Sequence, residues 1–178
     1  ELDLVLFESV KKREDRKPAL ITSNSALKKY EEHGLSEIVD ETEHYNNLKG
    51  SNKFETTRVG IVSGSPHYGD DFIKKWAALA GKSVTRVEGT KGMDQDFGPH
   101  GNRILHGMRE NEVLQAVLRF GRDGDGARVY VNTGALPKWV MPDETVSEIR
   151  PWPKGMFEIL DAVNELGQSE WRTGEIKE

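Results

Sequence analysis

The sequence predicts an α/β domain with a mostly parallel central sheet. Three short apolar runs of the kind that buried parallel strands show, Pro18–Thr22, Arg58–Ser63 and Ala127–Asn132, alternate with segments of helical periodicity. Repeated alternation of strands and helices is typical of a parallel sheet whose faces are both covered. The chain has 178 residues, enough for one domain with a substantial core and a small appendage.

The first part of the chain predicts a helix followed by a strand–helix unit. Leu2–Arg13 has apolar residues at helical spacing and predicts an amphipathic helix. Polar residues at the end of the strand Pro18–Thr22 cap a second helix, which ends at Gly34. Leu35–Asp40 is predicted as a short strand, and Glu41–Glu55 as a long polar loop or a weak helix.

The middle of the chain predicts a second strand–helix unit. The strand Arg58–Ser63 leads into a helix that Asp70 or Asp71 caps and that Gly81 closes. Three shorter segments follow, a strand or extended connector, a Gly-rich loop and a short strand, at Lys82–Glu88, Gly89–Asn102 and Arg103–His106.

A helix over Glu112–Asp123 is the central feature of this pattern. Gln115, Arg119 and Arg122 lie at i, i+4 and i+7, within about 60° of one another on one face. Arginine suits planar recognition of phosphate or carboxylate groups by several hydrogen bonds. The opposite face is apolar and is predicted to be buried, with Val113, Val117 and Phe120 at its centre and Leu114 and Leu118 on its flank.

Composition excludes several classes of protein. The net charge is −5, so the chain lacks the basic balance of a dedicated nucleic-acid-binding domain, and any such contact is local. It has no apolar run of 18 residues, which excludes a predicted transmembrane helix, and its start has no signal-peptide pattern. It has no cysteine, which excludes disulfides and thiolate metal sites. We therefore expect a cytoplasmic protein with no membrane partner.

A nucleotide site carried by this chain alone is not predicted. Gly81-Lys82-Ser83 matches the tail of the phosphate-loop pattern, but Trp76 stands where the pattern needs its first glycine, and a predicted helix precedes it. The sequence has no G-x-G-x-x-G either.

The Gln-x-x-x-Arg-x-x-Arg pattern between two predicted strands resembles motif VI of superfamily 2 helicases, although Leu118 stands where that family usually has Gly. Pro18–Ser23 looks like motif IV, and Lys91–Gly98 is similar to motif V of the iron–sulfur relatives. With H-Y-N-N-L-K-G-S-N, G-S-P-H-Y-G-D-D and F-G-R-D-G-D-G-A-R-V-Y-V, these segments resemble a group of archaeal, often plasmid-borne, helicase-like proteins over residues 15–140.

The resemblance implies a three-layer RecA-like domain over residues 1–150, lacking its own phosphate loop, as the second of two motor domains. Arg119 and Arg122 are then arginine fingers, Gln115 orients them or couples to the first domain, and Gly92 and Asp94 belong to motif V at the nucleotide. ATP and Mg²⁺ bind in the full-length parent, with its N-terminal RecA-like domain, and none is expected on this chain alone.

Polar loop residues are the expected contacts to a single-stranded nucleic acid, with DNA favoured over RNA. Small hydroxyl residues and glycines let backbone amides approach phosphates without a strongly basic surface. In a parallel sheet these loops are expected to gather at one edge. The residues concerned are Thr22, Ser23, Lys49, Ser51, Asn52, Ser65 and Lys91.

Two other functions stay open at this stage. One is a non-catalytic Rossmann-like domain whose arginine helix docks an acidic partner. The other is a metal-dependent nuclease, but the acids and histidines lack metal-ligand spacing, so no metal is predicted. Residues 151–178 predict a helical extension that begins a truncated winged helix-turn-helix; the alternative is an ordinary C-terminal helix packed on the sheet.

Overall fold

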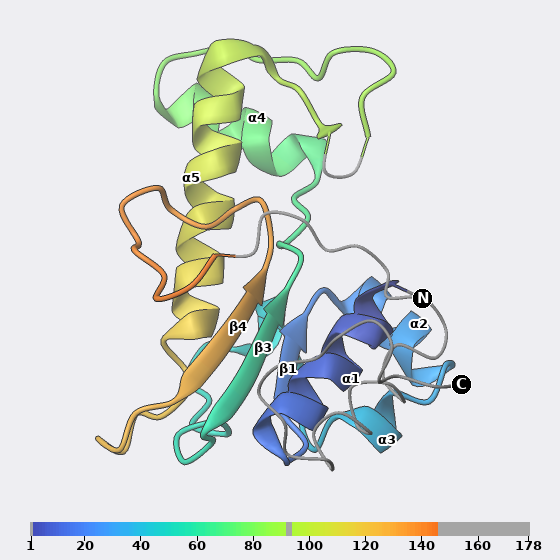
Figure 1. Ribbon diagram of the computed structural model, residues 1–178. Helices are drawn as coiled ribbons and strands as arrows, with labels where there is room; N and C mark the ends of the chain where they lie inside the picture. Colours follow the sequence, from blue (N-terminus) through green and yellow to red (C-terminus); the bar gives the residue numbers. More distant parts are fainter. Residues whose placement is uncertain (1, 92–93, 146–178) are drawn as a thin grey trace, which may run out of the picture. The chain divides into compact units, whose positions relative to one another are not determined.

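The computed structural model describes residues 2–91 and 94–145, which form an α/β fold built on a four-stranded sheet (Figure 1). The chain divides into two compact units, Glu1–Met141 and Pro142–Glu178. All helices and strands given below belong to the first unit. The predicted boundary after residue 150 and the predicted helix-turn-helix lie outside the described residues.

The sheet is entirely parallel. Its strands are β1 (Ala19–Thr22), β2 (Thr42–His44), β3 (Val59–Ser63) and β4 (Arg128–Asn132), in the order β2-β1-β3-β4. The two inner strands, β1 and β3, are buried at every residue, as their continuous apolar runs predict. The parallel sheet and three of its strands are thus confirmed, whereas β2 forms within the segment that the sequence predicted as a loop or weak helix.

The strand order reverses once. From β1 the chain moves to β2 on one side, and it then crosses to β3 on the other side of β1. In open parallel sheets, ligands bind outside the carboxyl ends of the strands at such a reversal. The strand order therefore makes the carboxyl ends of β1 and β3 the expected place for a ligand.

The helices largely follow the predicted periodicity. The helical elements are α1 (Leu2–Glu14), α2 (Asn24–Glu31), α3 (Leu35–Ile38), the 3₁₀ turn η1 (Tyr45–Asn47), α4 (Asp70–Leu79) and α5 (Gly98–Val117). Ser23 caps α2, since its Oγ accepts a hydrogen bond from the Ala26 amide at 3.2 Å. The predicted aspartate cap of α4 is wrong: Gly69 is its N-cap, and Asp70 Oδ2 accepts from Arg86 Nε at 3.0 Å instead.

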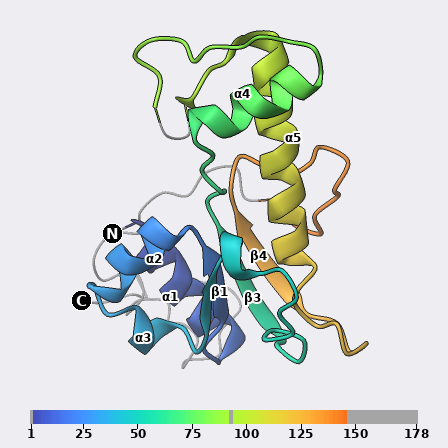
Figure 2. The same ribbon diagram turned by 180° about the vertical axis from the view of Figure 1, so that it is seen from behind.

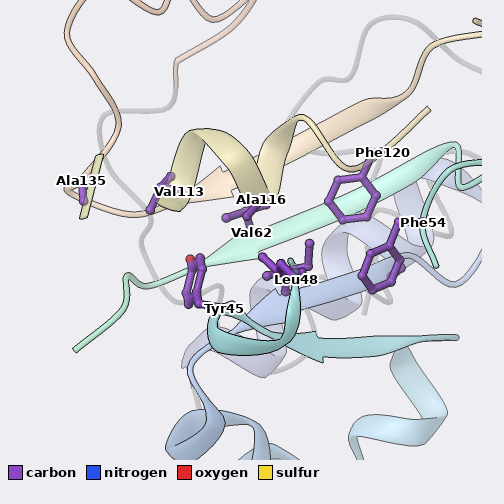
Figure 3. Close-up of a cluster of buried hydrophobic side chains, with 10 residues drawn as sticks. Tyr45, Leu48, Phe54, Val62, Val113, Ala116, Phe120 and Ala135 are labelled. Atoms are coloured by element: carbon purple, nitrogen blue, oxygen red, sulfur yellow. The ribbon is translucent and has the colours of Figure 1, made fainter. Parts of the chain in front are cut away.

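Alternate residues of β1 enter two separate hydrophobic clusters. Ala19 and Ile21 pack with α5 and with the segment around η1. Figure 3 shows this cluster, with Val113 and Ala116 of α5 and Tyr45 of η1 labelled. Leu20 packs with residues of α1, α2 and α3. This division follows from the two-residue period of a strand, which points successive side chains to opposite sides.

A third cluster joins α4 to the N-terminal half of α5, away from the strands (Figure 2). Its buried members are Ile73 of α4, Leu105 of α5 and Phe97, the residue before α5. The sheet and this helical pair therefore have separate cores, connected by the length of α5.

Two predicted strands are wrong. Leu35–Asp40 begins with the helix α3, because Leu35 and Val39 both enter a core cluster with the spacing of one helical turn. Arg103–His106 lies inside α5, which also takes the end of the predicted Gly-rich loop. Four residues are too few to show the period of a 20-residue helix, and Gly101 and Gly107 weaken the helical signal.

Within the described ranges, 2–91 and 94–145, no helix has both the length and the apolar character needed to cross a membrane.

Candidate functional site

The predicted helix over Glu112–Asp123 ends earlier than expected. α5 stops at Val117, and residues 118–126 form a connection to β4 that we call the arginine turn. Three glycines of this turn have positive φ, namely Gly121 (60°), Gly124 (99°) and Gly126 (72°). These left-handed conformations end the helical path because other residues adopt them only at a cost.

Leu118 is the C-cap of α5, with φ −73° and ψ 3°, and its side chain is 61% exposed. The prediction that it widens the buried stripe is therefore wrong. Its backbone is not in the left-handed region, so glycine is not required at this position. The departure from the helicase pattern at residue 118 thus leaves the local backbone undisturbed.

Phe120 anchors the arginine turn to the sheet. Its ring is buried and lies 5.1 Å from the Phe54 ring between centroids (Figure 3). The ring also covers Gly60 of β3. A Cβ on Gly60 would lie 2.7 Å from this ring, so only glycine permits the approach. The predicted burial of Val113 and Phe120 is confirmed, although Phe120 lies beyond the helix.

Arg119 joins the arginine turn to a predicted nucleic-acid loop. Its Nη1 donates to the carbonyl of Ser51 at 3.2 Å. Lys49 and Asn52, on either side of Ser51, are exposed. Lys53 Nζ donates to the carbonyl of Thr42, the first residue of β2, at 2.7 Å. The turn and the loop therefore meet near the amino ends of the strands.

Arg58 holds the far side of the arginine turn, although it was not among the residues predicted from the sequence. Its two Nη atoms donate to the two carboxylate oxygens of Asp123 at 2.7 and 2.6 Å, and Nη2 also reaches Asp125 at 2.9 Å. The Arg58 hydrogen bonds lower the pKa of Asp123. The sequence did contain a signal for this ion pair. Arg58 directly precedes β3 and Asp123 precedes β4, and neighbouring parallel strands bring their amino ends together.

Arg122 is exposed and has no hydrogen bond or ion pair with the described residues, while Gln115 is half-buried on α5. Gly121 takes the chain out of helical geometry between Arg119 and Arg122. Since α5 ends at Val117, Arg119 and Arg122 both lie beyond the helix, and the predicted common helix face of Gln115, Arg119 and Arg122 is wrong. The turn instead holds Arg119 inward, on Ser51, and leaves Arg122 facing solvent.

The carboxyl ends of the strands carry the other predicted contacts. Thr22 is 1% exposed and Ser65 is 6% exposed, and the Ser23 hydroxyl caps α2. Asn132 Nδ2 donates to Asp3 Oδ1 at 3.2 Å and to Ser63 Oγ at 3.5 Å. These polar residues are thus buried, as Thr22 and Ser65 are, or hydrogen-bonded within the fold, as Ser23 and Asn132 are.

Tyr45 contacts the carboxyl end of β3. Its hydroxyl donates to the carbonyls of Gly64 at 2.8 Å and Ser63 at 3.2 Å, and burial raises its pKa.

The predicted nucleic-acid residues do not share one edge of the sheet. Thr22, Ser23 and Ser65 lie at the carboxyl ends of the strands, whereas the loop with Ser51 lies near the amino ends.

A pocket of about 390 Å³ lies between α1 and α2. It is lined by Asp3, Ser25, Lys29, Tyr30 and His33, among others. The Tyr30 hydroxyl donates to Asp3 Oδ2 at 2.6 Å, which connects the pocket wall to Asn132 at the end of β4.

The connection between α4 and α5 holds the remaining predicted residues. Lys91 and Asp94 are exposed, and Gly92 lies outside the described residues. Asp96 Oδ1 accepts from the Gly98 amide at 2.8 Å and from Asn102 Nδ2 at 2.7 Å, which lowers the Asp96 pKa and fixes the start of α5. This acid therefore has a structural role, which was not predicted from the sequence.

Gln95 in the same connection contacts a buried arginine of α5. Arg109 of α5 is 2% exposed, and its Nη2 donates to Gln95 Oε1 at 3.2 Å. Gln95 Nε2 in turn donates to the carbonyl of Tyr68 at 3.2 Å. Burial lowers the pKa of Arg109 and raises that of Tyr68 to about 12. These contacts tie the start of α4 to the middle of α5.

Acidic and histidine side chains do not converge on a point within the described residues, which contain no group of three or more that could hold a metal ion. Comparison with known proteins adds no assignment: no protein-family model, curated protein or solved structure matches the chain.

Proposed function

We propose that this chain is the second RecA-like domain of a superfamily 2 helicase or translocase, with helices in layers on both sides of the sheet. It works with a separate domain that carries the phosphate loop and binds ATP and Mg²⁺. The resemblance of its motifs and their order along the chain motivate this proposal. The parallel sheet and the two clusters that flank β1 support the three-layer arrangement.

The observation that carries the proposal is the exposed Arg122 in a braced turn. Arg58 binds Asp123, the next residue, through two hydrogen bonds, and Arg119 binds the carbonyl of Ser51. The turn is thus held on both sides of a guanidinium that has no partner among the described residues. An exposed arginine on a backbone that is held on both sides suits the stabilisation of charge that develops on a transferring phosphoryl group.

In this proposal Arg122 is the finger that reaches the γ-phosphate. Arg119 positions the turn relative to the loop at Ser51, and Gln115 couples α5 to the partner domain. An arginine finger is worth about 10³–10⁵ in rate in phosphoryl-transfer enzymes where it has been measured. Since the chain has no phosphate loop, we expect little ATP hydrolysis by this chain alone.

The test is ATP hydrolysis by the full-length protein, which must contain a phosphate-loop domain. Arg122→Ala is expected to reduce ATP turnover by at least about 10³-fold, with binding of single-stranded DNA unchanged. Arg103→Ala, at an exposed arginine on α5 away from the turn, is the matched control and is expected to retain activity.

Two results would contradict the proposal. One is a full-length protein without a phosphate loop. The other is normal ATP hydrolysis by the Arg122→Ala variant, which would favour a non-catalytic module that docks an acidic partner through the arginine turn.

A further inference from the structure

The helix α4 presents aromatic rings to solvent. Tyr68, just before the helix, stacks on Phe72 with ring centroids 4.9 Å apart and planes at 11°. Phe72 is followed one turn later by Trp76, at 6.3 Å and 59°. Phe72 is 37% exposed and Trp76 is 47% exposed. We call Tyr68, Phe72 and Trp76 the aromatic ladder.

Packing within the described fold does not account for the exposed part of this ladder. α4 contacts α5 through its other side, where Ile73 and Ala77 are fully buried. Tyr68 packs against that core, but Phe72 and Trp76 do not belong to it. Leu79, 80% exposed, continues the outer stripe by one more turn. The helix thus has two apolar sides, of which the described protein covers one.

The charge around the ladder is opposite to that of the whole chain. From Tyr68 to Lys91 there are five basic residues and three acidic ones, Asp70, Asp71 and Glu88, so this segment has a net charge of +2, although the chain has a net charge of −5. Arg86 donates hydrogen bonds to Asp70 and to the Thr90 carbonyl. Lys75, in contrast, lies on α4 beside the ladder and is exposed. Exposed aromatic rings beside a lysine, in a segment of net positive charge, complement a flexible polyanion that carries flat, unpaired bases.

We infer that the aromatic ladder on α4 is a stacking platform for the bases of single-stranded nucleic acid, with Lys75 and its basic neighbours at the phosphates. Sequence-tolerant binding of single strands combines aromatic faces with a positive surface in this way. Tyr68 holds the ladder rigid, because it is itself fixed by the third core cluster and by Gln95. This inference rests on the proposed function for its partner, and it places base contacts away from the arginine turn.

The test compares three probes at low salt with the full chain: a labelled 12-nucleotide DNA strand, an abasic strand of equal length, and inorganic polyphosphate. Anisotropy is expected to show binding to the DNA strand that is at least about fivefold tighter than to the abasic strand. Trp76→Leu and Phe72→Leu keep apolar volume on the surface but remove the rings. Both are expected to abolish this difference while the polyphosphate affinity stays unchanged.

Trp139→Leu is the matched control, since Trp139 is 71% exposed in the segment after β4 and belongs to no ladder. It is expected to bind as the unmodified chain does, and circular dichroism checks that all variants are folded. The inference is overturned if Trp76→Leu binds the base-containing strand as tightly as the unmodified chain. It is also overturned if no probe binds, or if the ladder variants only abolish self-association of the chain.

The two proposals fail separately. If Arg122 is not an arginine finger, the Arg122→Ala variant hydrolyses ATP normally, while base-dependent binding of the DNA strand is still observed. If the aromatic ladder is not a stacking platform, the DNA and abasic strands bind with equal affinity, while Arg122→Ala still reduces ATP hydrolysis.

Discussion

The two ends of the sheet use their polar residues in opposite ways. At the carboxyl ends, Ser23 caps α2 and Asn132 bonds to Asp3 and Ser63, so these groups stabilise the fold. Near the amino ends, Arg119 and Arg58 brace a turn from which Arg122 is exposed. In the sequence, hydroxyl and amide residues are candidates for contacts to a nucleic acid. In the structure, most of those at the carboxyl ends are buried or hydrogen-bonded within the fold.

This difference predicts that mutations at the two ends separate stability from function. Changes at the carboxyl ends should lower the free energy of unfolding and leave nucleic-acid binding alone. Changes in the arginine turn should alter ATP turnover, and should lower stability only where backbone packing is disturbed.

The largest effect on stability is expected for Gly121→Ala in the arginine turn. Gly121 has φ 60°, and a Cβ there would lie 2.3 Å from the backbone carbon of Gly126. Left-handed strain and overpacking together should cost on the order of 3 kcal/mol, measured by urea unfolding. Gly34→Ala is the control: its φ is 84° but nothing lies within 4 Å, so only about 1 kcal/mol is expected. Equal losses at both sites would exclude the backbone contact as the cause.

A somewhat smaller loss is expected for Gly60→Ala, because a Cβ at this position meets the Phe120 ring at 2.7 Å. We expect a loss of about 1–3 kcal/mol in the free energy of unfolding. Phe120→Leu should recover part of that loss in the double variant, since the flat ring is the obstacle. Additive losses in the double variant would show that the two residues do not share this contact.

At the carboxyl ends, Ser23→Ala removes the side-chain acceptor of the Ala26 amide. The expected loss is about 1 kcal/mol in the free energy of unfolding. Affinity for single-stranded DNA should not change, because the hydroxyl serves the cap. A weakened affinity at unchanged stability would instead make Ser23 a contact residue.

The smallest effect is expected for Asp123→Asn, which weakens the clamp with Arg58 in an exposed setting. Because Arg58 lowers the Asp123 pKa, the carboxylate contributes stability above its unfolded-state pKa of about 4, and this contribution is lost as the pH falls through its lower folded-state pKa. The melting temperatures of the original chain and the variant should therefore differ slightly at pH 7 and converge in acid. Asp125→Asn, at the more exposed partner of Arg58, should show a smaller difference. A gap that widens in acid would contradict this linkage.

The sequence by itself determined the parallel α/β class. Continuous apolar runs such as Val59–Ser63 can only be satisfied by burial on both sides, and they predicted β1 and β3. It also predicted that polar residues after β1 cap α2, as Ser23 does, and that Val113 is buried, since capping and helical periodicity depend on neighbours in the chain. Phe120 is buried as predicted, but through a turn beyond the helix.

Only the tertiary structure decided where the chain leaves its regular elements and which polar groups are left exposed. α5 ends at Val117 because a glycine-rich turn folds Phe120 onto Gly60, a residue distant in the sequence. Contacts between remote segments also determine three other features. These are the Arg58–Asp123 pair, the separation of the predicted contact residues between the two ends of the sheet, and the uncovered side of α4. Local patterns do not encode such contacts, because the hydrogen-bond partners of a side chain are set by the strand order and by the packing of helices against the sheet.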